Sequence, residues 1–168
     1  METQDPRREE FVSLVKANSR SLFRAARALL DSDAATEDAV GEAVLLAWQS
    51  FHRLRDPSAA KGWLLRITVN CAYGQRRKTG REVPLEGLEE RAAPERDEER
   101  AHLWDAVRVL PEDQRLAVLL YYYEDMSVAE IARTLGVAQG TVKSRLSRGR
   151  DRLRQMLREE EQYGNQKT

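Results

Sequence analysis

Residues 127–148 read SVAEIARTLGVAQGTVKSRLSR and carry the strongest local structural signal in this chain. Apolar residues in this stretch recur at helical spacing on both sides of Gly136, where a left-handed backbone costs glycine little. Ile131 lies on the apolar stripe of a short first helix, and Val142 and Leu146 anchor a second one. Two helices joined by such a turn form a helix-turn-helix. The sequence therefore predicts this motif in the second half of the chain.

The outward positions of the second predicted helix carry side chains that suit a DNA major groove. Arginine binds guanine through two hydrogen bonds, glutamine binds adenine, and serine, threonine and lysine contact phosphates or base edges. Between Lys143 and Arg158, seven basic residues against one acidic residue give a net charge of +6, which strengthens attraction to phosphate. A plain helical hairpin with a solvated basic face is the alternative interpretation. We predict that the duplex is read by Gln139, Thr141, Lys143, Ser144, Ser147 and Arg148.

The rest of the chain is also predicted to be helical, because Gly and Pro are few and apolar residues recur at helical spacing. Ser58 is the expected cap of one helix, Pro111 the expected first turn of another, and Leu157 is expected to face inward near the end of the last. Helices are predicted over about 8–30, 33–51, 58–78, 100–109, 111–123 and 139–160.

One segment, residues 79–99, shows no sustained periodicity and contains two prolines and two glycines. Over 79–100, eight acidic residues against four basic ones give a net charge of −4. Opposite charge in separate segments indicates separate partners for them. We predict an all-α chain with two small helical domains, residues 1–78 and 100–168, joined by a flexible acidic linker at 79–99.

Composition excludes several classes of function. The chain has 168 residues, 41 % hydrophobic and 33 % charged, with a net charge of zero, so a packed core is expected. One cysteine, Cys71, and two histidines cannot form a disulfide or an ordinary structural zinc site. No histidine-centred constellation or phosphate-cradling glycine loop occurs, so we expect no enzyme activity, cofactor or small-molecule substrate. No apolar run approaches a membrane span and the N-terminus is polar, so we expect a cytoplasmic protein.

Two parts of the chain resemble conserved regions of the extracytoplasmic-function (ECF) sigma factors. The stretch Leu110–Leu157 resembles their fourth conserved region, although LuxR-type response regulators share a related helix-turn-helix. TEDAVGEAVLLAWQSF, Thr36–Phe51, followed by KGWLLRITVN, Lys61–Asn70, resembles their second conserved region, in the same order and with a similar linker. The resemblance implies a transcription initiation factor that binds core RNA polymerase, melts the minus-ten element and reads the minus-thirty-five element. It implies as partners the clamp coiled coil and flap of the polymerase, promoter DNA and an anti-sigma factor.

The resemblance also implies roles for residues of the first half. Asp38 and Glu42 match acidic positions that dock on the clamp coiled coil, and Leu45 shares their helix face. The loop 52–58 matches a loop that captures a base flipped out of the non-template strand, and Trp63 is either core or a base platform. The implied single-strand contacts are His52, Arg53, Arg55, Trp63, Arg66, Asn70 and Arg77.

Four positions depart from the family pattern. Gly41 stands where glutamine is usual and Gly74 where aspartate is usual, Ala138 replaces a serine cap, and Ser147 is smaller than in some relatives. Two rival functions stay open at this stage. One is a helix-turn-helix regulator with an unrelated sensor domain. The other, which Gly41 and Gly74 keep open, is a sigma-like antagonist that occupies polymerase without initiating. Cys71 is either a redox switch or, as its apolar stripe favours, an inert buried thiol.

Overall fold

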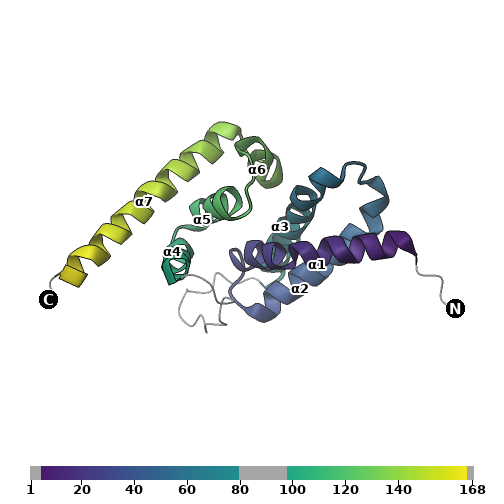
Figure 1. The fold of residues 1–168 in the computed structure, drawn as a ribbon, viewed down its shortest axis with the longest axis horizontal. Coiled ribbons are helices and arrows are strands. Elements are labelled where there is room, and N and C mark those ends of the chain that lie inside the picture. The colour runs from purple at the N-terminus through teal and green to yellow at the C-terminus, as the bar shows by residue number, and fades with distance from the viewer. Residues whose placement is uncertain (1–4, 80–97, 166–168) are drawn as a thin grey trace. The chain divides into compact units, whose positions relative to one another are not determined.

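The computed structural model describes residues 5–79 and 98–165, and every regular element in these ranges is helical (Figure 1). The chain divides into two compact units, Met1–Leu88 and Glu89–Thr168. The predicted all-α class with two small helical domains is therefore confirmed. The predicted linker, 79–99, lies almost entirely outside the described residues. None of the helices in residues 5–79 and 98–165 combines the length and the hydropathy of a membrane span.

Three helices that pack against one another build the N-terminal unit. A stripe of alanines on the second helix, Ala39, Ala43 and Ala47, is almost fully buried, and such small side chains let the neighbouring helices approach closely. The first and third helices contribute larger buried residues, including Leu22 and Leu64. The elements are α1 (Pro6–Arg27), α2 (Asp33–Ser50), the short 3₁₀ turns η1 (Phe51–Arg53) and η2 (Pro57–Ala59), and α3 (Ala60–Thr79).

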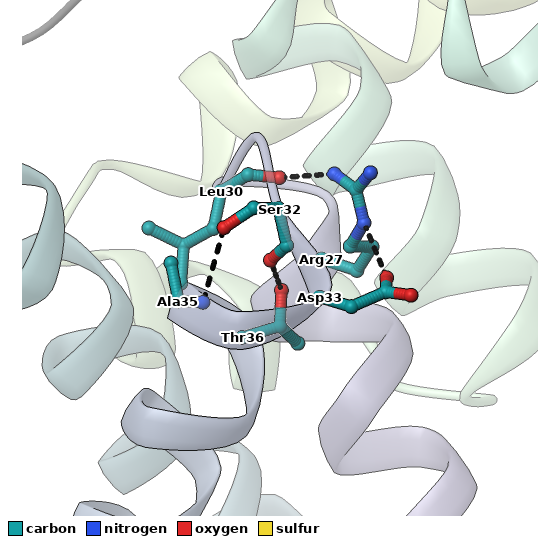
Figure 2. A network of polar contacts seen from close by, with 6 residues as sticks. All are labelled: Arg27, Leu30, Ser32, Asp33, Ala35 and Thr36. Carbon is teal, nitrogen blue, oxygen red and sulfur yellow. Dashed lines mark hydrogen bonds and ion pairs between the residues drawn. The ribbon is translucent and has the colours of Figure 1, made fainter. Parts of the chain in front are cut away.

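A polar network fixes the corner between α1 and α2 (Figure 2). Ser32 is the N-cap of α2, and its hydroxyl accepts a hydrogen bond of 3.1 Å from the Ala35 N–H. Thr36 Oγ1 donates to the Ser32 carbonyl at 2.8 Å. Across the corner, Arg27 Nε lies 3.3 Å from Asp33 Oδ1. The network sets where α2 begins and hence which of its faces is left exposed.

The C-terminal unit packs its shorter helices against one long helix. Leu116, Leu119, Ile131 and Val142 are completely or almost completely buried at the centre of this unit. The rings of Trp104 and Tyr123 meet edge to face with centroids 5.4 Å apart. The elements are α4 (Glu98–Arg108), α5 (Glu112–Val118), the π-helical turn η3 (Leu119–Tyr123), α6 (Val128–Leu135) and α7 (Gln139–Asn165).

Three local predictions were wrong. Asp56, not Ser58, caps the turn before α3, because its carboxylate accepts from the Ser58 N–H. Pro111 is the N-cap of α5 rather than part of its first turn. Leu157 is 38 % exposed instead of inward, since α7 runs on to Asn165 and its last buried residue is Leu153. These differences shift helix ends and leave the motif unchanged.

Asp125 joins η3 to α6 with a positive φ of 53°, the only such non-glycine residue among those described. A residue other than glycine destabilises the folded protein when its backbone is left-handed, and a β-branched residue does so most. We expect Asp125→Gly to raise the free energy of unfolding by up to about 1 kcal/mol and Asp125→Val to lower it by about 1–2 kcal/mol. Urea denaturation of the two variants tests this, and changes of the same sign in both would contradict it.

Candidate nucleic-acid interface

The helix-turn-helix is held by local hydrogen bonds at both ends of α6. Ser127 and Glu130 form a capping box, with Glu130 N–H to Ser127 Oγ at 3.1 Å and Ser127 N–H to Glu130 Oε2 at 3.0 Å. Gly136 ends the helix in the left-handed region, with φ 66° and ψ 35°. The Val137 N–H then bonds to the Ala132 carbonyl at 3.1 Å. The angle between α6 and α7 is thus specified by residues close together in the chain.

The first turns of α7 separate into a buried face and an exposed face. Val142 and Leu146 are buried against the rest of the unit. Ala138 has the N-cap position, where its carbonyl accepts from the Val142 N–H without a side-chain cap. All six residues predicted to read the duplex are exposed: Gln139, Thr141, Lys143, Ser144, Ser147 and Arg148.

The other basic residues of α7 do not all belong to that face. Arg145 is half-buried, with Nε 3.8 Å from Asp113 Oδ2 on α5. Arg150 donates to the Tyr122 hydroxyl at 3.1 Å. These two arginines tie α7 to α5 and η3. In the described part of the chain, Lys143 and Arg148 make no ion pair, so their charges remain available to a ligand.

A buried glycine that we did not predict lets α7 approach α5. A Cβ built on Gly149 would lie 2.8 Å from Val118 Cγ2 and 3.6 Å from Gln114 Cβ. Such a distance forces atoms to move, so only glycine fits without rearrangement. The signal was present but weak, because Gly149 falls three residues after Leu146 on the apolar stripe.

The loop after α2 in the N-terminal unit presents three exposed basic side chains, those of His52, Arg53 and Arg55. Asp56 stiffens it, since one of its carboxylate oxygens accepts from the Ser58 hydroxyl at 2.7 Å and from the Ser58 N–H at 3.0 Å. The Ser58 hydroxyl, followed by its backbone N–H, lowers the pKa of the Asp56 carboxyl. The loop therefore holds its basic side chains on a defined turn.

The polar face of α3 is exposed as predicted at Arg66, Asn70 and Arg77. Trp63 is half-buried, and its ring lies 6.4 Å from the ring of Phe51, centroid to centroid. Trp63 therefore lies at the edge of the aromatic side chains of the unit and is still partly accessible. The basic loop leads directly into α3. The basic side chains of the loop and the polar face of α3 are therefore neighbours in the chain and in space.

The exposed face of α2 carries Asp38, Glu42 and Leu45, and Leu45 is 58 % exposed. Their spacing of four and three residues aligns them on one side of the helix. Two further apolar residues that we did not predict, Leu46 and Trp48, are also exposed on α2. An exposed patch of large apolar side chains beside acidic ones is typical of a surface that binds another protein.

Cys71 is a buried thiol on α3, only 6 % exposed. Burial, followed by the negative charge of Glu42, raises the pKa of the thiol above its ordinary value. Because the thiolate is the reactive form, both effects slow its chemistry. We expect iodoacetamide to label Cys71 in the folded chain at pH 7.5 about 100-fold more slowly than in urea. Mass spectrometry measures this, and equal rates would instead favour a redox switch.

The exposed, basic second helix of the helix-turn-helix and the exposed basic loop of the other unit are typical features of DNA-binding proteins. Comparison with known proteins narrows this class. The sequence matches the family described as Sigma-70 region 2 over residues 14–82 and the one described as Sigma-70 region 4 over residues 100–153. The first match excludes an unrelated sensor domain in the N-terminal half.

Similar proteins cover most of the chain. It is 35 % identical to RNA polymerase sigma-E factor of Streptomyces coelicolor, across 88 % of this chain and 86 % of that protein. It is 36 % identical to ECF RNA polymerase sigma factor SigM of Mycobacterium tuberculosis, across 89 % of this chain and 78 % of that protein. A solved structure of the sigma factor RpoE with the anti-sigma factor NepR, from Bartonella quintana, has a TM-score of 0.76 and 30 % identity, covering 89 % and 98 % of the two chains.

The chain belongs to the ECF sigma factors of the sigma-70 family. It is a transcription initiation factor that directs RNA polymerase to promoters, and not an enzyme.

Proposed function

We propose that two domains, residues 1–78 and 100–168, have separate binding functions and that residues 79–99 link them. The first domain docks on the clamp coiled coil of core polymerase and captures the melted minus-ten strand. The second reads the minus-thirty-five duplex and contacts the flap. The observation that carries this proposal is the exposure of all six predicted reading residues of α7, above the buried Val142 and Leu146.

Duplex reading by α7 rests on the chemistry of its exposed face. Arg148 has the donor geometry for a guanine, and Gln139 that for an adenine. Lys143, Ser144 and Ser147 supply donors for phosphates or base edges. Arg145 and Arg150 contact Asp113 and Tyr122 of the same unit, whereas Lys143 and Arg148 make no ion pair in the described part of the chain.

Capture of single-stranded DNA rests on the loop after α2 and the polar face of α3. Exposed arginines attract the backbone, and aromatic or imidazole rings stack on unpaired bases. His52 and Arg55 lie on the loop, whereas Arg66, Asn70 and Arg77 line α3. Unstacking a base costs a few kcal/mol, so the stiffness that Asp56 gives the loop helps to preorganise the site.

Docking on core polymerase rests on the exposed face of α2. Asp38 and Glu42 provide negative charge for a basic partner helix, and Leu45 with Trp48 provides apolar area. Gly41, where the family usually has glutamine, is exposed, and a Cβ there meets no atom within 4 Å. The position therefore has room for the family residue.

The solved relative RpoE was crystallised with an anti-sigma factor, which supports a partner of the same kind for this chain. We further propose the cytoplasm as its location, because core polymerase and promoter DNA are found there.

The recognition helix is tested by transcription from promoters with intact or scrambled minus-thirty-five elements. With holoenzyme, we expect Arg148→Ala to lower run-off from the intact promoter about 10-fold or more, since one bidentate base contact contributes about 1–3 kcal/mol. Arg158→Ala, in the last turns of the same helix, is the control and should change little. Equal loss in both variants, or none in Arg148→Ala, would contradict base reading by this residue.

A further inference from the structure

Helix α7 continues beyond the packed part of its unit (Figure 1). Its last buried residue is Leu153, whereas the helix runs on to Asn165. The match to Sigma-70 region 4 also ends at residue 153. Residues 154–165 extend for about 18 Å, and all of them are exposed except Met156, which is half-buried. Region 4 therefore does not account for this end of α7.

The end of α7 has little of its own to hold it helical. Helices are stabilised mainly by packing of an apolar face, and residues 154–165 bury no side chain fully. Three consecutive glutamates, 159–161, approach the C-terminal end of the helix, where its dipole disfavours negative charge, and the last turn contains no basic residue. Gly164 lowers the helix propensity further. A partner that supplies apolar area and positive charge would stabilise this segment.

One stripe of α7 offers such a partner both apolar and charged side chains. It consists of Arg152, Met156, Glu159 and Tyr163, whose spacing of four, three and four residues is that of two-helix coiled coils. The Tyr163 side chain is 74 % exposed. Arg152 and Glu159 are both exposed and lie about 10 Å apart along the axis, too far to pair within one helix. In the parts of the chain that the structure describes, Arg152 makes no ion pair.

We propose that a second copy of this chain packs antiparallel on this stripe. A two-fold axis at Met156 places Met156 against Met156 of the second copy. The reversed direction then sets Arg152 of each copy beside Glu159 of the other, which gives two ion pairs across the interface. Tyr163 lies one turn beyond Glu159, so the same Arg152 also reaches its ring for a cation–π contact.

The order of the charges selects this arrangement. Four arginines and one aspartate occupy residues 150–158, and three glutamates follow at 159–161. Parallel helices in register would place Arg152 on Arg152 and Glu159 on Glu159, whereas antiparallel helices place opposite charges together. A single stripe buries less than about 1,200 Å², the range of weak, transient interfaces, so the dimer should form at micromolar concentrations. This inference concerns the free chain and does not depend on the proposed function.

Sedimentation equilibrium of the full chain, from about 1 to 500 µM, tests the proposal in that weak range. The apparent mass of the wild-type chain should rise from 19.3 kDa toward that of a dimer. Arg152→Glu and Glu159→Arg should each raise the dissociation constant about 10-fold or more, because two attractions become two repulsions. The combined variant, Arg152→Glu/Glu159→Arg, reverses both pairs and should return to within about 3-fold of the wild-type value. Arg133→Glu, an exposed arginine on α6, is the matched control for net charge and should dimerise normally.

Cross-linking tests the position of the two-fold axis. Met156→Cys should form a covalent dimer when oxidised with diamide, because the two thiols meet at the axis. Gln155→Cys, on a neighbouring exposed face, should not, and the buried Cys71 is common to both variants. A monomer mass at every concentration, no recovery in the combined variant, or cross-linking at residue 155 but not 156 would overturn the inference. These measurements contain no polymerase or promoter, so their failure leaves the proposed function standing.

Discussion

Replacing Gly149 with leucine should disrupt the packing of α7 on α5. A Cβ at this position already comes within 2.8 Å of Val118 Cγ2, and both Val118 and Gly149 are buried. Overpacking of this kind costs about 1–3 kcal/mol, and leucine adds three further carbon atoms to the clash. We expect the free energy of unfolding of the C-terminal unit to fall by about 3 kcal/mol, even though a helix gains about 1 kcal/mol when glycine is removed.

Hydrogen exchange in the full chain measures this effect for each unit separately. Amides of α5 and α7 should lose about 100-fold in protection, and those of α1–α3 should be unchanged. Gly140→Ala is the matched control, because Gly140 lies on the same helix with no atom within 4 Å of a Cβ. That variant should be neutral or more stable. Wild-type protection in Gly149→Leu would show that α5 and α7 do not approach this closely.

Reversing the charge of the acidic face of α2 should weaken binding to core polymerase about 100-fold, which corresponds to about 3 kcal/mol. Asp38→Lys/Glu42→Lys replaces two exposed acids that are four residues apart, so both changes fall on one face. Against a basic partner helix, two attractions become two repulsions. Both side chains are exposed, so we expect the fold to persist.

Fluorescence anisotropy of labelled chain against core polymerase gives the affinity. The control, Glu160→Lys/Glu161→Lys, makes the same change of net charge on exposed residues near the end of α7. The α2 variant should also lose most of the salt dependence of binding. Equal affinities for the wild-type chain and the α2 variant would exclude this face as the docking surface, and equal losses in both variants would mean that only net charge matters.

The features that the sequence predicted well depend on residues close together in the chain. Gly136 at a positive φ and the apolar stripes through Ile131 and Val142 are all local, so their pattern carries the motif. The exposure of Asp38 and Glu42 followed for the same reason, since a helix of known phase has a known outer face.

The features that the sequence did not predict depend on contacts between distant residues. Nothing near Arg7 or Glu10 indicates that α1 meets the loop at His52, although the structure shows these residues lining one pocket. From the sequence alone, Gly149 is expected to destabilise a basic helix, because glycine has a low helix propensity. Its role becomes clear only from the close approach of Val118, which leaves no room for a Cβ. Leu157 was misassigned because periodicity cannot tell where a packing partner ends.

Run-off transcription with purified core polymerase, with and without this chain, on a pool of promoter fragments tests the claim that the chain initiates transcription at specific promoters. An initiation factor predicts transcripts that require the chain and share a minus-ten and a minus-thirty-five sequence. Tight binding to core polymerase without any chain-dependent transcript would contradict that claim and indicate a sigma-like antagonist instead.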